Sequence, residues 1–418
     1  MVLEIRIRNF FSIKDEVVLD FRAAKMNTQA TKALENNIFD FDKTQVLKTV
    51  VLYGANASGK SSIIKAIRFC NAMIFESHRH NEDTVCNFEP FKFKSCQKKP
   101  SSYFIRFVSN SVEYEYSFSL TRTEIISESL NYYPKGRIAK IFSRDERLGD
   151  LKKEKYSFGS VIRRPMDVAE STSNKTLYIS RASQMDRVIP KEIFKYFNET
   201  FILGYMGHNA RSVEALFTEN KTLLLKTLKI ADSDIVDIKL RKEVLPGKNV
   251  KANLSTSTAS VEDVDQEHLK ITPYHRSSEK VPFDFFTEES AGTIKLFFIM
   301  LTILDIIKNN KILLVDEIGE SLHTSIIEYI IELFNAGKQA QLIYTTHNTK
   351  LLNLKKLRKD QIYFVNKKDD ASTDLYSLYD YSDFRDTMDV EKAYLQGRFD
   401  AIPFIDDSSE NLKSIVNG

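Results

Sequence analysis

Cysteine is scarce in this sequence, and neither sign of charge dominates it. The three cysteines, Cys70, Cys86 and Cys96, include no C-x-x-C pair, which argues against a disulfide framework and favours a reducing interior. With 60 basic and 57 acidic side chains the net charge is +3. That balance neither requires nor excludes binding to nucleic acid, because a protein with a nearly neutral net charge can still carry a local basic patch. The 418 residues are enough for two or three globular domains.

Long apolar runs are also missing, as are repeats of fixed period and extended heptads. The longest apolar run, residues 294–307, is interrupted by Lys295, Thr302 and Asp305. It is too short to cross a bilayer, so a buried helix is expected there. Residues 1–6 alternate polar and apolar side chains and lack the apolar core of a signal peptide. We therefore expect a cytoplasmic protein with no membrane partner.

A phosphate-binding loop is the clearest motif of the sequence. Apolar residues 50–53 precede the pattern G-x-x-x-x-G-K-S, and a helical pattern over residues 63–67 follows it. Strand, glycine-rich loop and helix in this order are the context in which the pattern binds phosphate. The alternative, a glycine- and serine-rich turn with an incidental lysine, is disfavoured by the complete pattern and its flanks. The phosphate loop consists of Gly54, Ala55, Asn56, Ala57, Ser58, Gly59, Lys60, Ser61 and Ser62.

The phosphate loop predicts a site for a nucleoside triphosphate with Mg²⁺. Backbone N–H groups of the loop would point at the phosphates, and the following helix would present its positive end. Lys60 would contact the β- and γ-phosphates, and the Ser61 hydroxyl would ligate Mg²⁺. Lys14, at a turn between two predicted strands, could contact a phosphate or face solvent.

Two carboxylates end a second apolar strand, residues 311–315. Asp316 stands where an aspartate coordinates Mg²⁺ directly or through water, and Glu317 is placed to polarise the attacking water. A buried strand that ends in a solvated acidic turn is the alternative. The phosphate loop elsewhere in the chain favours the nucleotide site.

Two further segments could complete the site. Ser290 precedes the apolar helix, and the N–H groups around Gly292 would form a second anion-binding helix start; taken alone, this pattern indicates a good N-cap. Residues 341–346 predict a strand that ends at His347. A lone histidine there is usually structural, but beside the other motifs it is a candidate contact of the γ-phosphate.

Outside these motifs, the sequence predicts antiparallel strands and then helices. Tyr114, Tyr116 and Phe118 share one face of a strand, which indicates sheet packing and not a base-stacking platform. The composition of residues 245–267, rich in Gly, Lys, Asn, Ser, Thr and Asp, predicts a mobile loop. Strands are predicted at 3–9, 16–21, 91–93, 103–108, 113–120, 124–132, 137–142 and 235–240, and helices between 165 and 228, most strongly at 191–197 and 213–228.

The order of the motifs resembles that of the ABC-type ATPases. It runs G-x-x-x-x-G-K-S, E-S-x-G-T, L-L-V-D-E, S-L-H and T-T-H, and the opening N-F-F-S resembles that of chromosome-maintenance and recombinational-repair members. The match is closer to prokaryotic ATPases of the overcoming-lysogenization-defect type, found in abortive-infection, PARIS and related antiphage systems. Residues 394–403 resemble the end of their stand-alone ATPase subunits. The likeness covers about residues 1–95 and 283–405 and extends only loosely to the middle.

This resemblance implies an α/β fold, with an ABC-type ATPase head built on a mixed sheet with flanking helices, and an inserted β/α lobe. Residues 1–95 and 283–418 would form the two parts of the ATPase domain, and residues 96–282 the inserted lobe. The family also implies a head-to-head homodimer, or a higher homo-oligomer, with two ATP molecules at the interface. Each phosphate loop would face the signature segment, residues 290–293, of the other subunit.

The resemblance also assigns roles. Asp316 would support Mg²⁺, Glu317 would be the catalytic base and His347 the switch histidine, while residues 320–323 would contact the other subunit. The signature differs from the family pattern, because it is E-S-A-G-T instead of L-S-G-G-Q, and Thr324 stands where relatives often have proline. The glutamine that ligates Mg²⁺ in many ABC proteins has only a weak candidate, Gln97, so hydrolysis could be slow.

Together these features favour an ATP-hydrolysing sensor or scaffold subunit of a bacterial antiphage system. About fifty residues follow the last predicted ATPase strand, too few for an appended nuclease, so a separate, nuclease-like effector protein is expected. One alternative is a DNA-repair or recombination ATPase that clamps nucleic acid through the basic runs 152–155, 163–164 and 355–359, although short basic runs are more often solvated faces. Another is an ATP-locked structural platform that hydrolyses slowly.

Overall fold

The computed structural model describes residues 1–204, 210–230, 234–253, 258–277, 279–319, 322–402 and 414–416. The chain forms two compact units. The larger unit comprises Met1–Gly204, Asn310–Glu320 and Ile331–Gly418, and the smaller comprises Tyr205–Asn309 and Ser321–Ile330. The predicted division at residues 95 and 282 stays a prediction.

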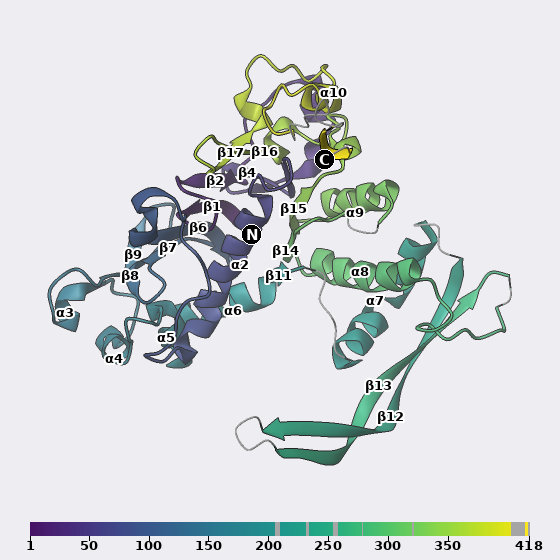
Figure 1. The fold of residues 1–418 in the computed structure, drawn as a ribbon, viewed down its shortest axis with the longest axis horizontal. Coiled ribbons are helices and arrows are strands. Elements are labelled where there is room, and N and C mark those ends of the chain that lie inside the picture. Colours follow the sequence, from purple (N-terminus) through teal and green to yellow (C-terminus); the bar gives the residue numbers. More distant parts are fainter. Residues whose placement is uncertain are drawn as a thin grey trace. The chain divides into compact units, whose positions relative to one another are not determined.

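The larger unit contains an antiparallel sheet (Figure 1). Along its strand Val112–Leu120, alternate side chains are buried. Tyr114, Tyr116 and Phe118 all lie on its buried face, so the prediction of sheet packing is confirmed. Six of the predicted strands lie in this sheet. Five of them have small shifts at their ends: 3–9, 16–21, 103–108, 113–120 and 124–132. The sixth, 137–142, overlaps β9 (Ala139–Asp145). In spatial order the strands are β10 (Tyr156–Phe158), β9 (Ala139–Asp145), β8 (Ile125–Tyr132), β7 (Val112–Leu120), β6 (Ser101–Ser109), β1 (Val2–Arg8) and β2 (Val17–Asp20).

The strand predicted at residues 91–93 is wrong. The Asn9 side chain, and not a neighbouring strand, accepts the N–H of Phe91 at 3.1 Å. Its amide also donates to the carbonyls of Cys96 and Lys99. A buried asparagine therefore holds this segment in an irregular path, which apolar side chains alone could not indicate.

A second, mixed sheet of the larger unit carries the predicted nucleotide motifs. Its central strand β5 (Thr49–Tyr53) is buried along its whole length and runs parallel to both neighbours. Only the last strand, β17, is antiparallel to the strand beside it. The α/β prediction of a mixed sheet with flanking helices is thereby confirmed. The strand order is β11 (Phe201–Leu203), β14 (Ile312–Val315), β15 (Gln341–Thr346), β5, β16 (Ile362–Lys367) and β17 (Thr373–Ser377).

One buried apolar cluster joins the two sheets with helices of the larger unit. The helix predicted after the phosphate loop is α2 (Lys60–Glu76), whose apolar face contributes Ile63, Ile64 and Ile67 to that cluster. The other short elements are α1 (Gln29–Lys32), β3 (Ile38–Phe41), β4 (Thr44–Leu47), α3 (Lys152–Lys155), α4 (Pro165–Glu170), α5 (Tyr178–Gln184), α6 (Val188–Thr200) and α10 (Val390–Leu395), and α9 (Thr324–Ala336) contributes residues to both units.

The described part of the smaller unit contains α7 (Ala210–Ile230), α8 (Ala291–Lys308), the first turns of α9 and a long β-ribbon. α7 and α8 contact each other through Phe217 and Phe297, and they confirm the helices predicted at 213–228 and 294–307. None of the helices in the described ranges has the length and apolar character needed to cross a membrane.

The mobile loop predicted at residues 245–267 is wrong. β12 (Ile235–Asn253) and β13 (Thr258–His275) pair antiparallel over this stretch and form an extended ribbon (Figure 1). Its base is held to α7 by ion pairs of Lys221 with Asp237, at 2.7 Å, and of Lys242 with Glu214, at 2.6 Å. Ile235 and Ile238, in the strand predicted at 235–240, are buried at this base, but from residue 245 on the polar composition lacks the usual alternation of a strand. Residues 254–257 lie outside the described residues.

Candidate nucleotide-binding site

Three parallel strands bring the predicted residues to one edge of the mixed sheet. The register pairs Leu314 of β14 with Ile343 of β15, and Thr346 of β15 with Tyr53 of β5. The phosphate loop follows Tyr53, the pair Asp316 and Glu317 follows β14, and His347 follows β15. Since parallel strands end on the same side of a sheet, segments more than two hundred and fifty residues apart in the chain converge there.

Two glycines allow the phosphate loop to pack closely against the sheet. Gly59 has φ 117°, a left-handed conformation that side chains disfavour. A methyl group on Gly59 would overlap the Thr373 hydroxyl, and one on Gly54 would overlap the Val365 carbonyl. The loop then enters α2 at Lys60. Its glycines are therefore required by geometry.

Lys60 folds back over the loop. Its side chain is 4% exposed, and its Nζ donates to the carbonyls of Gly54, at 2.8 Å, and Ala55, at 3.0 Å. Burial lowers the pKa of the Lys60 ammonium, and the nearby carboxylates of Glu317 and Asp316 oppose that shift. Among the described residues, no carboxylate lies within ion-pair distance of this buried cation.

The loop fits a polyphosphate group. Besides the Lys60 ammonium, the Ser58 hydroxyl is buried and has no hydrogen-bond partner in the described part of the chain. Phosphate oxygens would supply acceptors for both groups, and for the loop N–H groups at the start of α2. Ser61, at the first turn of α2, and Asp316 supply the oxygen ligands that Mg²⁺ prefers. When bound, Mg²⁺ would neutralise charge on the phosphates.

Thr345 connects the Asp316 carboxylate with the backbone of Glu317, and the sequence did not single it out. Its buried hydroxyl donates to Asp316 Oδ1 at 2.8 Å and accepts the backbone N–H of Glu317 at 2.7 Å. Glu317 adopts φ 55°, which is uncommon for a residue with a side chain. The one available signal was the position of Thr345 in T-T-H at the end of a buried strand.

Glu317 and His347 form the exposed part of this edge. His347 Nε2 lies 3.0 Å from Glu317 Oε1, and their side chains are 43% and 34% exposed. The carboxylate is therefore oriented by a neighbouring ring and is accessible to water. This is an arrangement suited to a general base.

A hydroxyl network supports the phosphate loop from the β16–β17 side. Ser12 Oγ lies 2.8 Å from Ser62 Oγ and 2.7 Å from Thr373 Oγ1, and Thr373 donates to the Ser58 carbonyl at 3.1 Å. Lys14, which was expected to contact either a phosphate or solvent, forms a 2.6 Å ion pair with Asp370. The hydrogen bond from Lys14 holds the pKa of that carboxyl well below its usual range. Thr373 and Asp370 lie in a segment with no recognisable motif.

The predicted signature residues belong to the smaller unit. Ser290 is the N-cap of α8, and its hydroxyl accepts the N–H of Thr293 at 3.0 Å. Gly292 is exposed, with no atom nearer than 3.6 Å to the place of a methyl group. The helix start thus has room for an added group. Of residues 320–323, which were predicted to contact the other subunit, residues 320 and 321 lie outside the described residues. Gln97, the weak candidate for the Mg²⁺-ligating glutamine, is exposed in a 3-10 helix.

Two of the three basic runs proposed as nucleic-acid contacts are largely engaged within the protein, whereas Arg163 and Arg164 of the third are exposed. In the run 355–359, Lys356 pairs with Glu332 at 2.8 Å and Lys359 with Asp386 at 3.2 Å. Arg358, 4% exposed, pairs with Asp360 at 2.7 Å. In the run 152–155, Lys152 donates to the Thr172 carbonyl and Lys155 pairs with Glu146. Little of either run remains as a free cationic face.

A phosphate loop between a buried strand and a helix, beside an Asp-Glu pair at the end of a parallel strand, defines a P-loop ATPase of the AAA/ABC-like type. The chain belongs to the family described as "AAA domain, putative AbiEii toxin, Type IV TA system", whose model matches residues 50–353. No curated protein sequence matches the chain.

Two solved structures are similar to the chain. One is described as the crystal structure of the SmcHead bound to the C-winged helix domain of ScpA, with 16% identity over 94% of this chain and 99% of that chain, and a TM-score of 0.40. The other is an SMC head domain from Thermotoga maritima, with 14% identity over 90% of this chain and 98% of that chain, and a TM-score of 0.41.

Proposed function

We propose that the chain binds ATP with Mg²⁺ at the edge formed by the phosphate loop, Asp316 and Glu317, and hydrolyses it. The observation that carries this proposal is the parallel register of β14, β15 and β5, which brings the phosphate loop and the two carboxylates to one edge of the mixed sheet. The Lys60 ammonium would exchange its two carbonyl acceptors for the β- and γ-phosphates. Ser61 and Asp316 would hold the metal.

In this proposal Glu317 is the catalytic base. Its carboxylate would take a proton from the water that attacks the γ-phosphorus, while the bond from that phosphorus to the bridging oxygen breaks and ADP leaves. His347, 3.0 Å from the carboxylate, would orient it. Thr345 would fix the backbone turn that points Glu317 outward.

The second part of the proposal is a dimer of two chains around two nucleotides. The signature segment of one chain would face the phosphate loop of the other. Its support is chemical: the first turn of α8 presents N–H groups around an exposed Gly292, an arrangement that attracts anions. The Ser290 hydroxyl would donate a hydrogen bond to the γ-phosphate.

The third part is biological. The chain would be the sensor or scaffold subunit of a bacterial antiphage system of the overcoming-lysogenization-defect type, with a separate nuclease-like effector. The motif order of the sequence supports this role, and the family description, which names a toxin of a type IV toxin–antitoxin system, supports the context of such a system but not the separate effector. ATP binding or hydrolysis would set the state of the subunit, and the effector would perform the toxic reaction.

Phosphate release under multiple turnover tests the enzymatic core. The wild type should release phosphate, and both Lys60→Ala and Glu317→Gln should abolish release, but only Lys60→Ala should lose ATP binding. Equal rates for wild type and Glu317→Gln would contradict hydrolysis as proposed and favour an ATP-locked platform. Cleavage of DNA or RNA by the purified Glu317→Gln chain with Mg²⁺ would contradict the separate effector.

A further inference from the structure

Two open sheet edges lie side by side in the larger unit. β2 is the last strand of the antiparallel sheet, and β17 is the last strand of the mixed sheet. The Tyr363 hydroxyl, from β16, bridges them: it donates to the Asp20 carbonyl and accepts the Asp20 N–H, each at 3.1 Å. One tyrosine thus takes the place of a neighbouring strand at a single position of β2.

The other residue on the outer side of β2 is Val18. Backbone groups two residues apart in a strand point the same way, so those of Val18 point away from β1, as those of Asp20 do. No strand in the described ranges pairs with this side of β2. Val18 itself is exposed. Exposed edges of this kind accept an added strand.

A pocket of about 520 Å³ lies between these two edges, within the usual range for ligand sites. Its aromatic wall consists of Tyr363, Tyr376 and Tyr379. Tyr379 is 43% exposed, so its ring is available to a ligand. Segments 16–24 and 375–380 form the facing walls.

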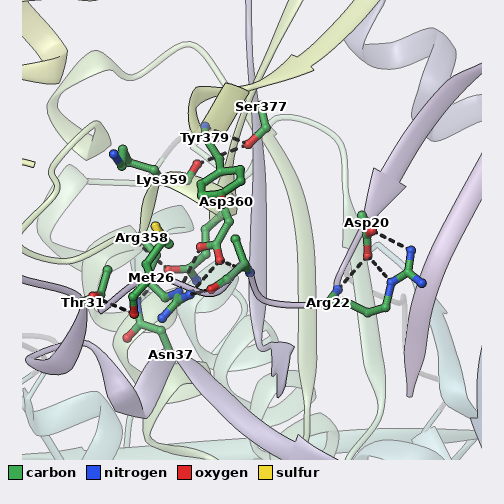
Figure 2. Close-up of polar contacts among 12 residues, drawn as sticks. Asp20, Arg22, Met26, Thr31, Asn37, Arg358, Lys359, Asp360, Ser377 and Tyr379 are labelled. Atoms are coloured by element: carbon green, nitrogen blue, oxygen red, sulfur yellow. Dashed lines mark hydrogen bonds and ion pairs between the residues drawn. The ribbon is translucent and has the colours of Figure 1, made fainter. Parts of the chain in front are cut away.

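The pocket is acidic, and among the described residues part of that charge is not paired with a cation. Asp20 pairs with Arg22, and Asp360 pairs with Arg358, each at 2.7 Å (Figure 2). Two more carboxylates of the lining, Glu16 and Asp380, are exposed and form no ion pair with any described residue.

Three of these carboxylates act on the pKa of the Tyr363 hydroxyl. Burial raises the pKa of Tyr363, and the charges of Asp20, Asp360 and Asp380 act in the same direction. A cationic ligand would therefore enter a negative field. Ring faces and carboxylates together form a preferred environment for an ammonium or guanidinium group.

This pocket is separate from the nucleotide edge. β17 begins at Thr373, which contacts the Ser58 carbonyl of the phosphate loop, and Ser377 at its other end lines the pocket. Four residues of strand span about 13 Å. The pocket can therefore be tested without disturbing the phosphate loop.

We propose that this pocket binds an extended, basic segment of a partner protein. The segment adds to the outer edge of β2 and places a lysine or arginine side chain between Glu16, Asp380 and the ring of Tyr379. Backbone pairing with β2 supplies affinity, and the two carboxylates select a basic side chain. This inference goes beyond the nucleotide site and does not depend on hydrolysis.

The test uses a fluorescent eight-residue peptide of alternating lysine and valine with the full chain at low ionic strength. The wild type should bind it, and Glu16→Gln combined with Asp380→Asn should weaken binding at least about tenfold. Asn at 380 keeps a side-chain acceptor for the Ser377 N–H. The control pair Glu35→Gln with Glu82→Gln, two exposed acids outside the pocket lining, makes the same change of charge and should leave binding unchanged.

Two further peptides separate the parts of the proposal. A twin of alternating glutamate and valine should not bind, and a lysine peptide with alternate backbone nitrogens methylated should bind at least about tenfold more weakly, since it cannot donate to β2. Equal binding of the glutamate twin, equal binding to the pocket variant, or no binding of the lysine peptide would overturn the proposal. Unchanged binding of the methylated peptide would overturn strand addition. Phosphate release by the pocket variant, measured alongside, should match the wild type, so failure here is distinguishable from failure of the ATPase proposal.

Discussion

The Thr345 hydroxyl donates to Asp316 Oδ1 at 2.8 Å and so links two neighbouring parallel strands at the nucleotide edge. The same oxygen accepts the N–H of Glu317. A single buried hydroxyl therefore holds the proposed metal ligand and the proposed base in fixed relation.

Thr345→Val should lower kcat about 10- to 100-fold, because a hydrogen bond to a charged group is worth about 1.5–3 kcal/mol. KM for ATP should change little, since the phosphate loop is untouched. Thr345→Ser keeps the hydroxyl and should retain most of the activity. Steady-state kinetics on the three proteins decide the point, and a Thr345→Val enzyme with wild-type kcat would contradict the positioning role.

Gly59→Ala should abolish ATP binding, because a methyl group there meets Thr373 in a left-handed backbone conformation. Gly136→Ala is the matched control: it is also left-handed, at φ 71°, but has open space around it. That variant should lose only about 1–2 kcal/mol of unfolding free energy, the cost of the left-handed conformation, and should bind ATP normally. The measurement is the rise in unfolding temperature on adding ATP, and a full rise in Gly59→Ala would contradict the packing argument.

Lys60 should make stability depend on alkaline pH. Burial lowers its pKa in the folded state, so the cost of burying the charge is fully present below the folded pKa. That cost disappears as pH rises through the folded pKa toward the unfolded value. The unfolding free energy of the wild type should therefore increase relative to that of Lys60→Met between pH 7 and pH 10. A difference that stays constant over this range would show that the Lys60 ammonium is not destabilised by burial.

Arg358→Met should destabilise the chain by about 3–5 kcal/mol, because it leaves the buried carboxylate of Asp360 without its cation. Lys355→Met, three residues earlier on an exposed side chain, should change stability by less than about 0.5 kcal/mol. Chemical denaturation of both variants gives the comparison. Similar small effects would mean that the run 355–359 is a solvated basic face after all.

The convergence of the motifs could be predicted because each ends a buried strand, and parallel strands end on one side of a sheet. The contact of Thr345 with Asp316 could not, since it depends on the register between β14 and β15. The support from Thr373 also required the tertiary fold, as that residue carries no motif. The strand predicted at 235–240 is the start of β12, but the rest of the ribbon of β12 and β13 was missed because its polar sequence lacks the alternation typical of a strand. The pocket beside β2 arises only where two sheets meet.

The central claim is that two copies of the chain close on ATP, with Lys60 and Glu317 of one facing Ser290 of the other. Light scattering on Glu317→Gln with ATP and Mg²⁺ tests it most directly. The mass should be twice the 48.2 kDa of one chain, and adding Ser290→Arg should return it to that of a single chain. A Glu317→Gln protein that remains at the single-chain mass with saturating ATP, or a dimer indifferent to Ser290→Arg, would contradict the account.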